Sequence, residues 1–82
     1  SEGLKPGVPD ICLPVARGKY HGLYVELKRR DQRASRVRDS QRWWLVELGV
    51  QGYHAQVCYG AEDAQGVILR YLALEDGKAM PV

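Results

Sequence analysis

Two short runs of the sequence alternate apolar and polar residues, and a loop containing two glycines separates them. Residues 11–15 carry isoleucine, leucine and valine at every second position, and residues 23–28 repeat the pattern with leucine, valine and leucine. Alternation with a period of two predicts two β-strands joined as an antiparallel hairpin. Because Pro14 cannot donate a hydrogen bond to a neighbouring strand, the first strand is expected at a sheet edge or at a bulge.

After the second run the spacing of apolar residues changes to that of a helix, beginning at about Ser35. The face that this helix would bury holds four residues, Val37, Gln41, Trp44 and Leu48. Gly49 and Gly52 then supply a stop signal. The sequence therefore predicts one amphipathic helix directly after the hairpin.

Residues 53–58 alternate again, and a second helix is expected after Gly60. Its apolar stripe consists of Ala64, Val67, Ile68, Tyr71 and Leu72. The stretch from residue 23 to residue 58 is long enough for a crossover between parallel strands. The pattern predicts an α/β fold, a small mixed β-sheet flanked by helices in the order strand, strand, helix, strand, helix. Residues 1–82 would form a single domain, with residues 75–82 as a loose tail.

Composition narrows the class of protein. The chain has 82 residues, of which 45% are hydrophobic, and a formal net charge of +2, values that suit one small folded domain rather than a disordered chain. No run approaches the ~20 apolar residues that a membrane span needs. The two cysteines, Cys12 and Cys58, are too few for a disulfide scaffold and are expected to be packed thiols. His21 and His54 show no spacing typical of a zinc site.

The small net charge conceals a strongly basic segment. Residues 28–42 contain seven basic and two acidic residues, for a local charge of +5. Six of the basic residues are arginines, namely Arg29, Arg30, Arg33, Arg36, Arg38 and Arg42. Guanidinium groups match phosphate oxygens, so the segment is a candidate DNA-binding surface. The alternative is an ordinary solvated helix face.

Both strands of the expected hairpin carry an acid on a polar face. A turn centred on Gly18 would place Asp10 opposite Glu26, and a turn centred on Lys19 would place Asp10 opposite Lys28. Either register gathers the three residues into one patch, with neighbouring side chains roughly 5–8 Å apart. Two carboxylates so close repel each other unless a cation lies between them, and a hard divalent ion such as Mg²⁺ or Mn²⁺ suits such a pair. The alternative is an exposed sheet face with a simple Glu–Lys pair.

Gln41 lies in the middle of the apolar stripe of the first helix. A buried amide is costly unless it has hydrogen-bond partners. From this position Gln41 could reach a metal-bound water or a phosphate on the sheet. It could instead be satisfied by backbone carbonyls of the core.

These residues resemble a known family. Gly7-Val8-Pro9-Asp10, then Glu26-Leu27-Lys28, then Gln41 six residues after Ser35 are similar to the motifs of the PD-(D/E)xK nuclease superfamily, and within it to VRR-NUC (virus-type replication-repair nuclease) domains. The resemblance implies a restriction-endonuclease-like fold and metal-dependent hydrolysis of DNA phosphodiester bonds. It also implies that Asp10, Glu26 and the backbone carbonyl of Leu27 bind Mg²⁺ or Mn²⁺. In the same scheme Lys28 is the catalytic lysine and Gln41 a supporting residue.

The resemblance further suggests a structure-selective, Holliday-junction-resolvase-like endonuclease that acts as a homodimer in the cytoplasm of a bacterium or a phage-infected cell. Related proteins carry a helix with a further acid before the Pro-Asp motif, so the chain is expected to be N-terminally incomplete. Trp43 lies about 100° from the buried stripe of its helix and is expected to be half exposed at a dimer contact. The rival interpretations are a non-catalytic DNA-binding module with a nuclease-like fold and a RecB-like or restriction-type nuclease.

Overall fold

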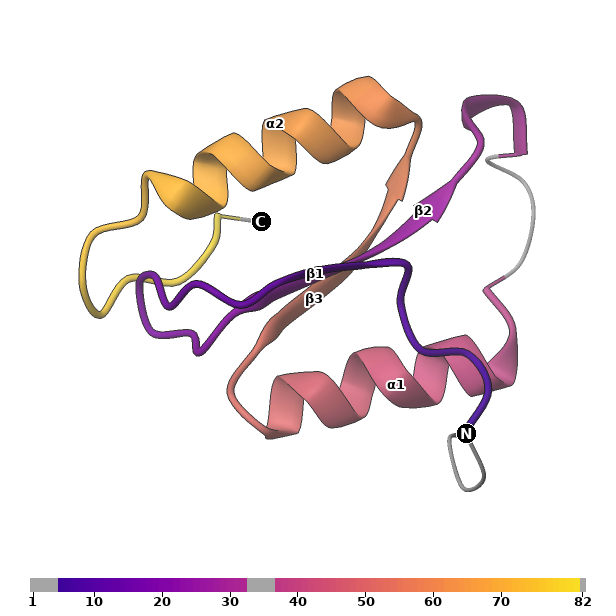
Figure 1. The fold of residues 1–82 in the computed structure, drawn as a ribbon, viewed down its shortest axis with the longest axis horizontal. Coiled ribbons are helices and arrows are strands. Elements are labelled where there is room, and N and C mark those ends of the chain that lie inside the picture. The colour runs from indigo at the N-terminus through magenta and orange to yellow at the C-terminus, as the bar shows by residue number, and fades with distance from the viewer. Residues whose placement is uncertain (1–4, 33–36, 82) are drawn as a thin grey trace.

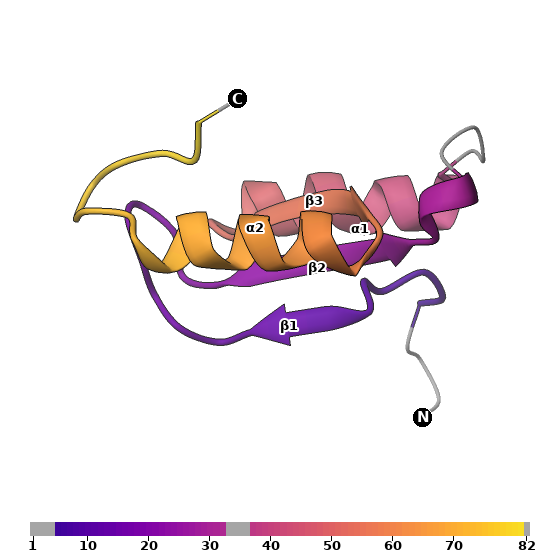
Figure 2. The same ribbon diagram turned by 90° about the horizontal axis from the view of Figure 1, so that it is seen from above.

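The computed structural model describes residues 5–32 and 37–81. The elements, in chain order, are β1 (Ile11–Leu13), β2 (Leu23–Lys28), the short 3₁₀ helix η1 (Arg30–Gln32), α1 (Asp39–Val50), β3 (His54–Tyr59) and α2 (Ala61–Leu72). The three strands form one sheet in the order β1-β2-β3, with β1 antiparallel and β3 parallel to the central β2. Figures 1 and 2 show α1 and α2 on opposite sides of this sheet. The predicted mixed sheet with flanking helices is confirmed.

The hairpin register decides between the two arrangements that the sequence allowed. Ile11 pairs with Val25 and Leu13 with Leu23, which is the register of a turn centred on Gly18. Gly18 itself has a φ of +57°, a backbone conformation that glycine adopts without strain. Continued by one residue beyond β1, this register places Asp10 opposite Glu26. As predicted from Pro14, β1 is an edge strand, and it ends at Leu13.

The hydrophobic core lies between the sheet and α2. It contains Leu23, Val25, Cys58, Ala64, Val67, Tyr71 and Met80. Tyr71 is fully buried, and its hydroxyl donates a 2.6 Å hydrogen bond to the carbonyl of Val15. The predicted stripe of α2 is correct except at Leu72, which is 38% exposed. Leu72 follows Tyr71 and is therefore rotated by about 100° away from the core.

Helix α1 begins later than its apolar spacing predicts. Arg38 is extended, with φ −67° and ψ 157°, and the first helical residue is Asp39. The Gln41 side chain ends the extended segment, because its Oε1 accepts the backbone N–H of Arg38 at 3.0 Å. Val37 therefore lies before the helix, while the predicted start at Ser35 lies outside the described residues.

The buried stripe of α1 is only partly correct. Gln41 and Leu48 are buried as predicted. Trp44 is half buried, and its indole Nε1 donates to the carbonyls of Lys5 and Pro6 at 3.1 Å. These two hydrogen bonds hold residues 5–6, the first described residues, against α1.

Residues 75–81 form neither helix nor strand, but they are not loose. The backbone N–H of Lys19 donates to the carbonyl of Lys78, and the N–H of Met80 donates to the hydroxyl of Tyr20, both at 2.9 Å. The Met80 side chain is buried in the core. These contacts correct the expectation of a loose tail for the described part, 75–81, since an apolar residue near the end finds a place beneath the hairpin.

The two cysteines differ from each other. Cys58 is buried, and burial raises the pKa of its thiol to about 11. Cys12 is exposed, against expectation, because it lies on the edge strand while α1 packs chiefly against β3. None of the described helices is long and apolar enough to cross a membrane.

Candidate active site

Asp10 is fixed to the end of β2 by a hydrogen bond to the backbone. Its Oδ2 accepts the N–H of Leu27 at 2.8 Å. This contact takes the place of a ladder hydrogen bond, because β1 begins one residue later, at Ile11. The carboxylate is exposed and stands at the edge of the sheet, beside the strand that carries Glu26 and Lys28.

The carbonyl of Leu27 faces the same edge. The main-chain carbonyl of Lys28 points toward β3, where it accepts the N–H of Gly60 at 2.9 Å. Main-chain groups alternate between the two sides of a strand, so those of Leu27 point toward β1, as its bond to Asp10 confirms. The residue opposite Leu27 in this register is Pro9, which has no N–H to donate. Pro9 therefore leaves the Leu27 carbonyl without its ladder donor and available to a ligand.

Glu26 is buried, with only 4% of its surface exposed. Its Oε2 accepts a 2.9 Å hydrogen bond from Nε2 of Gln41 and lies 3.8 Å from the Lys28 ammonium. Burial raises the pKa of Glu26, the neighbouring Asp10 carboxylate raises it further, and Lys28 and Arg38 oppose the shift. The surroundings of Glu26 therefore disfavour its ionised form. A cation between the two carboxylates would lower the pKa again and favour ionisation.

Gln41 joins the two charged groups of β2 to helix α1. Its Nε2 donates to Glu26, and its Oε1 accepts from Nζ of Lys28 at 3.0 Å as well as from the Arg38 N–H. The amide is therefore satisfied by site residues and a helix start, and not by carbonyls of the core. It orients Lys28 and Glu26 together.

Gly7 shows how the loop before β1 is held against α1. Its φ is +98°, and a Cβ at this position would lie 2.7 Å from the Ser40 carbonyl carbon and 2.9 Å from the Gln41 backbone nitrogen. Only glycine fits so close an approach at this backbone angle. The loop that carries Asp10 thus rests directly on the helical turn that carries Gln41. Pro9, the residue before Asp10, is buried.

The donor set fits a hard divalent cation. Within residues 5–32 and 37–81 no group of three or more His, Cys, Asp or Glu side chains is arranged to bind a metal. An ion here would be held by Asp10, Glu26 and the Leu27 carbonyl, all oxygen donors, with water completing its shell. That arrangement is typical of Mg²⁺, which keeps several waters and uses one or two carboxylates.

Four of the six arginines of the predicted basic surface lie within the described residues. Arg29, Arg30, Arg38 and Arg42 are exposed. Arg29 forms a 3.5 Å ion pair with Asp31, in which both side chains are largely solvent-accessible. Arg33 and Arg36 lie outside the described residues. The exposed arginines flank the strand end and the helix start that carry Lys28 and Gln41.

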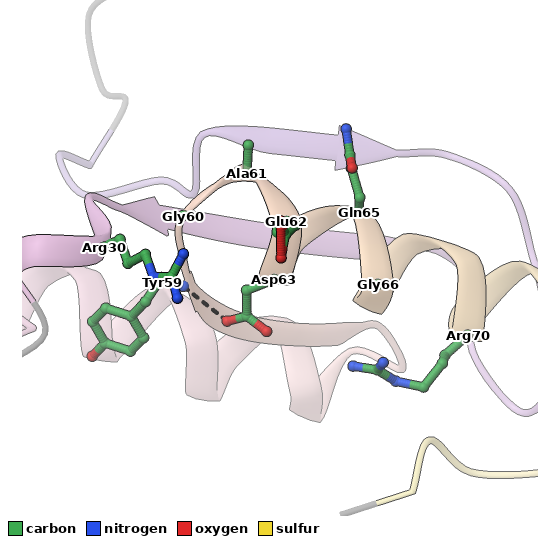
Figure 3. Close-up of a pocket in the computed structure, with 9 residues that line it drawn as sticks. All are labelled: Arg30, Tyr59, Gly60, Ala61, Glu62, Asp63, Gln65, Gly66 and Arg70. Atoms are coloured by element: carbon green, nitrogen blue, oxygen red, sulfur yellow. Dashed lines mark hydrogen bonds between the residues drawn. The ribbon is translucent and has the colours of Figure 1, made fainter.

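Two adjoining grooves, which the sequence gave no means of finding, open at this end of the sheet. The larger, of about 670 Å³, runs along the first turns of α2, where Asp63 accepts the Tyr59 N–H at 2.9 Å (Figure 3). The smaller, of about 340 Å³, is lined by Leu27, Lys28, Arg29, Arg30, Gly60 and Ala61. The smaller groove therefore shares Leu27 and Lys28 with the candidate active site.

Comparison with known proteins gives concordant results. The profile of the VRR-NUC domain matches residues 1–62, a range that includes Asp10, Glu26, Lys28 and Gln41. A solved structure described as a VRR_NUC domain protein superposes with a TM-score of 0.85 at 34% sequence identity, covering 98% of this chain and 65% of that one. No curated protein matched. This chain spans somewhat less than two thirds of that relative. On the sequence match and the shared fold together, the chain belongs to the VRR-NUC nuclease domain family.

Proposed function

We propose that this domain is a metal-dependent endonuclease that hydrolyses phosphodiester bonds in DNA. The observation that carries the proposal is the joining of Glu26 and Lys28 through one amide, Gln41, directly across the hairpin from Asp10. A protein that only binds DNA needs positively charged side chains, and two carboxylates facing a phosphate would weaken that binding. A carboxylate pair beside a lysine is instead suited to phosphate chemistry with a divalent ion.

Asp10, Glu26 and the Leu27 carbonyl would hold Mg²⁺ or Mn²⁺. When bound, such an ion lowers the pKa of a coordinated water and offsets charge on a phosphate oxygen. For this task Glu26 must be ionised, and its raised pKa means that the ion competes with a proton for the same carboxylate.

Lys28 has a position suited to the attacking water and the reacting phosphate. Its ammonium has three donors, of which Gln41 accepts one at 3.0 Å. The remaining donors can orient the nucleophile or stabilise negative charge that develops on the phosphate. Gln41 is a positioning residue in this scheme, since it holds the ammonium and the Glu26 carboxylate in a fixed relation.

We extend the proposal to the substrate and the assembly. The exposed Arg29, Arg30, Arg38 and Arg42 would bind the phosphates of DNA, and branched DNA such as a four-way junction is the proposed preferred form. A two-fold homodimer would present two sites to a symmetric junction. The exposed stripe of Trp43, Val46 and Val50 on α1, respectively 43%, 61% and 72% accessible, supports a contact between copies.

The dimer is tested by its hydrodynamic size. Trp43→Ala removes the largest side chain of the exposed stripe, and Leu69→Ala removes an even more exposed apolar residue from the other helix as a control. We expect the native chain and Leu69→Ala to elute from size exclusion as dimers and Trp43→Ala as a smaller species. A dimer that persists in Trp43→Ala would count against this surface.

The activity is tested by cleavage of a four-way junction, a flapped duplex and a linear duplex in Mg²⁺ or Mn²⁺. Lys28→Met keeps the aliphatic stem and removes the ammonium, and Lys78→Met does the same at an exposed lysine far along the chain. We expect cleavage of branched DNA by the native chain and Lys78→Met, and its loss in Lys28→Met. Metal-insensitive binding without cleavage would indicate a binding module, and equal cleavage of linear duplex a restriction-type enzyme.

A further inference from the structure

The smaller groove lies at the end of β2, on the α2 side of the sheet, and meets the candidate active site at Leu27 and Lys28. We propose that this groove receives an unpaired nucleobase of the nucleotide next to the reacting phosphate. The inference rests on the proposed function and specifies its substrate, DNA with an unpaired base at the cut. At about 340 Å³ the groove lies at the lower end of the range for small-ligand sites, ~300–1,000 Å³.

The groove has an apolar wall close to the reactive groups. Leu27 ends the apolar face of β2, and its side chain is 39% exposed although the leucine and valine before it on that face are fully buried. Ala61 contributes a second small apolar group at the start of α2. The Leu27 side chain lies on the α2 side of the sheet, whereas its main chain contacts Asp10 at the β1 side of the strand. A nucleotide that spans the end of β2 would therefore rest its base on Leu27 and extend its phosphate toward the carboxylates.

Gly60 lines the groove where the chain passes from β3 to α2. It adopts a φ of +94°, and a Cβ built there would lie 3.3 Å from Cβ of Arg30 and 3.9 Å from its Cδ. The aliphatic stem of Arg30 therefore runs along Gly60, as the close-up in Figure 3 also shows at this turn. Planar guanidinium groups stack on nucleobases and bind phosphates, so Arg30 can serve either part of a nucleotide.

The two grooves differ in the charge of the residues that line them. Its lining contains Lys28, Arg29 and Arg30 and no acid. The larger groove shares Arg30, Gly60 and Ala61 and adds Arg70, but it also adds two acids, Glu62 and Asp63, which would repel a phosphate. Apolar contact with cations around it matches a nucleotide, whose base is flat and whose backbone is anionic.

A base can enter a groove only when it is not stacked in a duplex. Extruding a paired base costs several kcal/mol, and the cost is least where the base is already unpaired. The groove would therefore favour nicks, flaps and branch points over continuous duplex, and it supplies a physical basis for the structure selectivity proposed above.

The test compares substrates within each variant. Branched substrates carry an abasic nucleotide at one position after another on either side of the cut, and cleavage is measured relative to the intact strand. The variants are Leu27→Ala, which removes the wall and keeps the backbone carbonyl, and Ala61→Leu, which fills the groove. Leu69→Ala, an exposed leucine on the outer surface of α2, is the matched control.

We expect one abasic position to lower cleavage by the native chain and by Leu69→Ala about tenfold, a loss typical of one stacked base. The same substitution should change cleavage by Leu27→Ala and Ala61→Leu less than twofold. An abasic loss of equal size in all four proteins places the base elsewhere and overturns the groove assignment. Equal cleavage of every abasic strand by the native chain also overturns it and leaves the nuclease proposal standing. If the native chain cleaves no DNA in either metal, the proposed function itself fails.

Discussion

The two faces of the three-stranded sheet differ in what they bury. Toward α2, β2 presents Leu23 and Val25, both fully buried against Val67 and Tyr71. Toward α1, the same strand presents Glu26 and Lys28, joined by Gln41. Because side chains alternate along a strand, one six-residue segment serves both faces. We therefore expect the buried part of the apolar face to determine stability and the polar face to carry the proposed chemistry, with the exposed Leu27 and Ala61 at the end of the sheet contacting only the substrate.

The largest expected effect is on the polar face. Glu26→Gln preserves shape and the hydrogen bond with Gln41 but removes a carboxylate that we propose as a metal ligand, so cleavage of a four-way junction should fall by about 10²–10⁴-fold. The free energy of unfolding should not decrease, because a neutral amide escapes the burial and the Asp10 repulsion that raise the Glu26 pKa. Cleavage rates and urea unfolding measure the two effects. The exposed Glu75, changed to Gln, is the control, and undiminished cleavage by Glu26→Gln would remove Glu26 from the site.

The opposite effect is expected on the apolar face. Val67 is 1% exposed, and Val67→Ala should lower the free energy of unfolding by about 1–3 kcal/mol through lost burial and a residual cavity. Cleavage per folded molecule should stay unchanged. Leu69→Ala on the exposed side of the same helix should alter stability by less than about 0.5 kcal/mol. A large loss of cleavage by folded Val67→Ala would show that the two faces are not independent.

A smaller effect should appear in the pH dependence of stability. The pKa of Glu26 is raised in the folded chain, so between its ordinary value of 4.5 and the raised value the folded state binds more protons than the unfolded state. The stabilising contribution of the protonated carboxyl is therefore lost as pH rises through this window. Glu26→Gln should remove that part of the decline, as denaturant titrations at successive pH values would reveal. The same decline in both proteins would assign it to other groups.

Much of the site was predictable because it depends on local rules. Alternation placed Asp10, Glu26 and Lys28 in one patch, and the position of Gln41 on an apolar stripe marked it as unusual. The choice between two registers was not predictable, because it depends on the geometry of the turn at Gly18. The start of α1 was also beyond a spacing argument, since the Gln41 side chain ends the extended segment by accepting from Arg38.

Features that need tertiary context were missed for the same reason. Met80 follows a polar stretch and gave no periodic signal, yet it fills space under the hairpin and orders residues before it. Cys12 has the pattern of a half-buried strand, but helix α1 packs chiefly on β3 and leaves it exposed. The smaller groove joins residues from two parts of the chain, 27–30 and 60–61, which only the parallel pairing of β2 and β3 brings together.

The most direct test of the polar face is calorimetric titration of Mn²⁺ into the native chain, Asp10→Asn, Glu26→Gln and the control Glu75→Gln. We expect the native chain and Glu75→Gln to bind the ion, with affinity that increases as Glu26 loses its proton at higher pH. Asp10→Asn and Glu26→Gln should lose binding while remaining folded. Binding that survives both substitutions, or no binding by the native chain, would contradict a metal site between these two carboxylates.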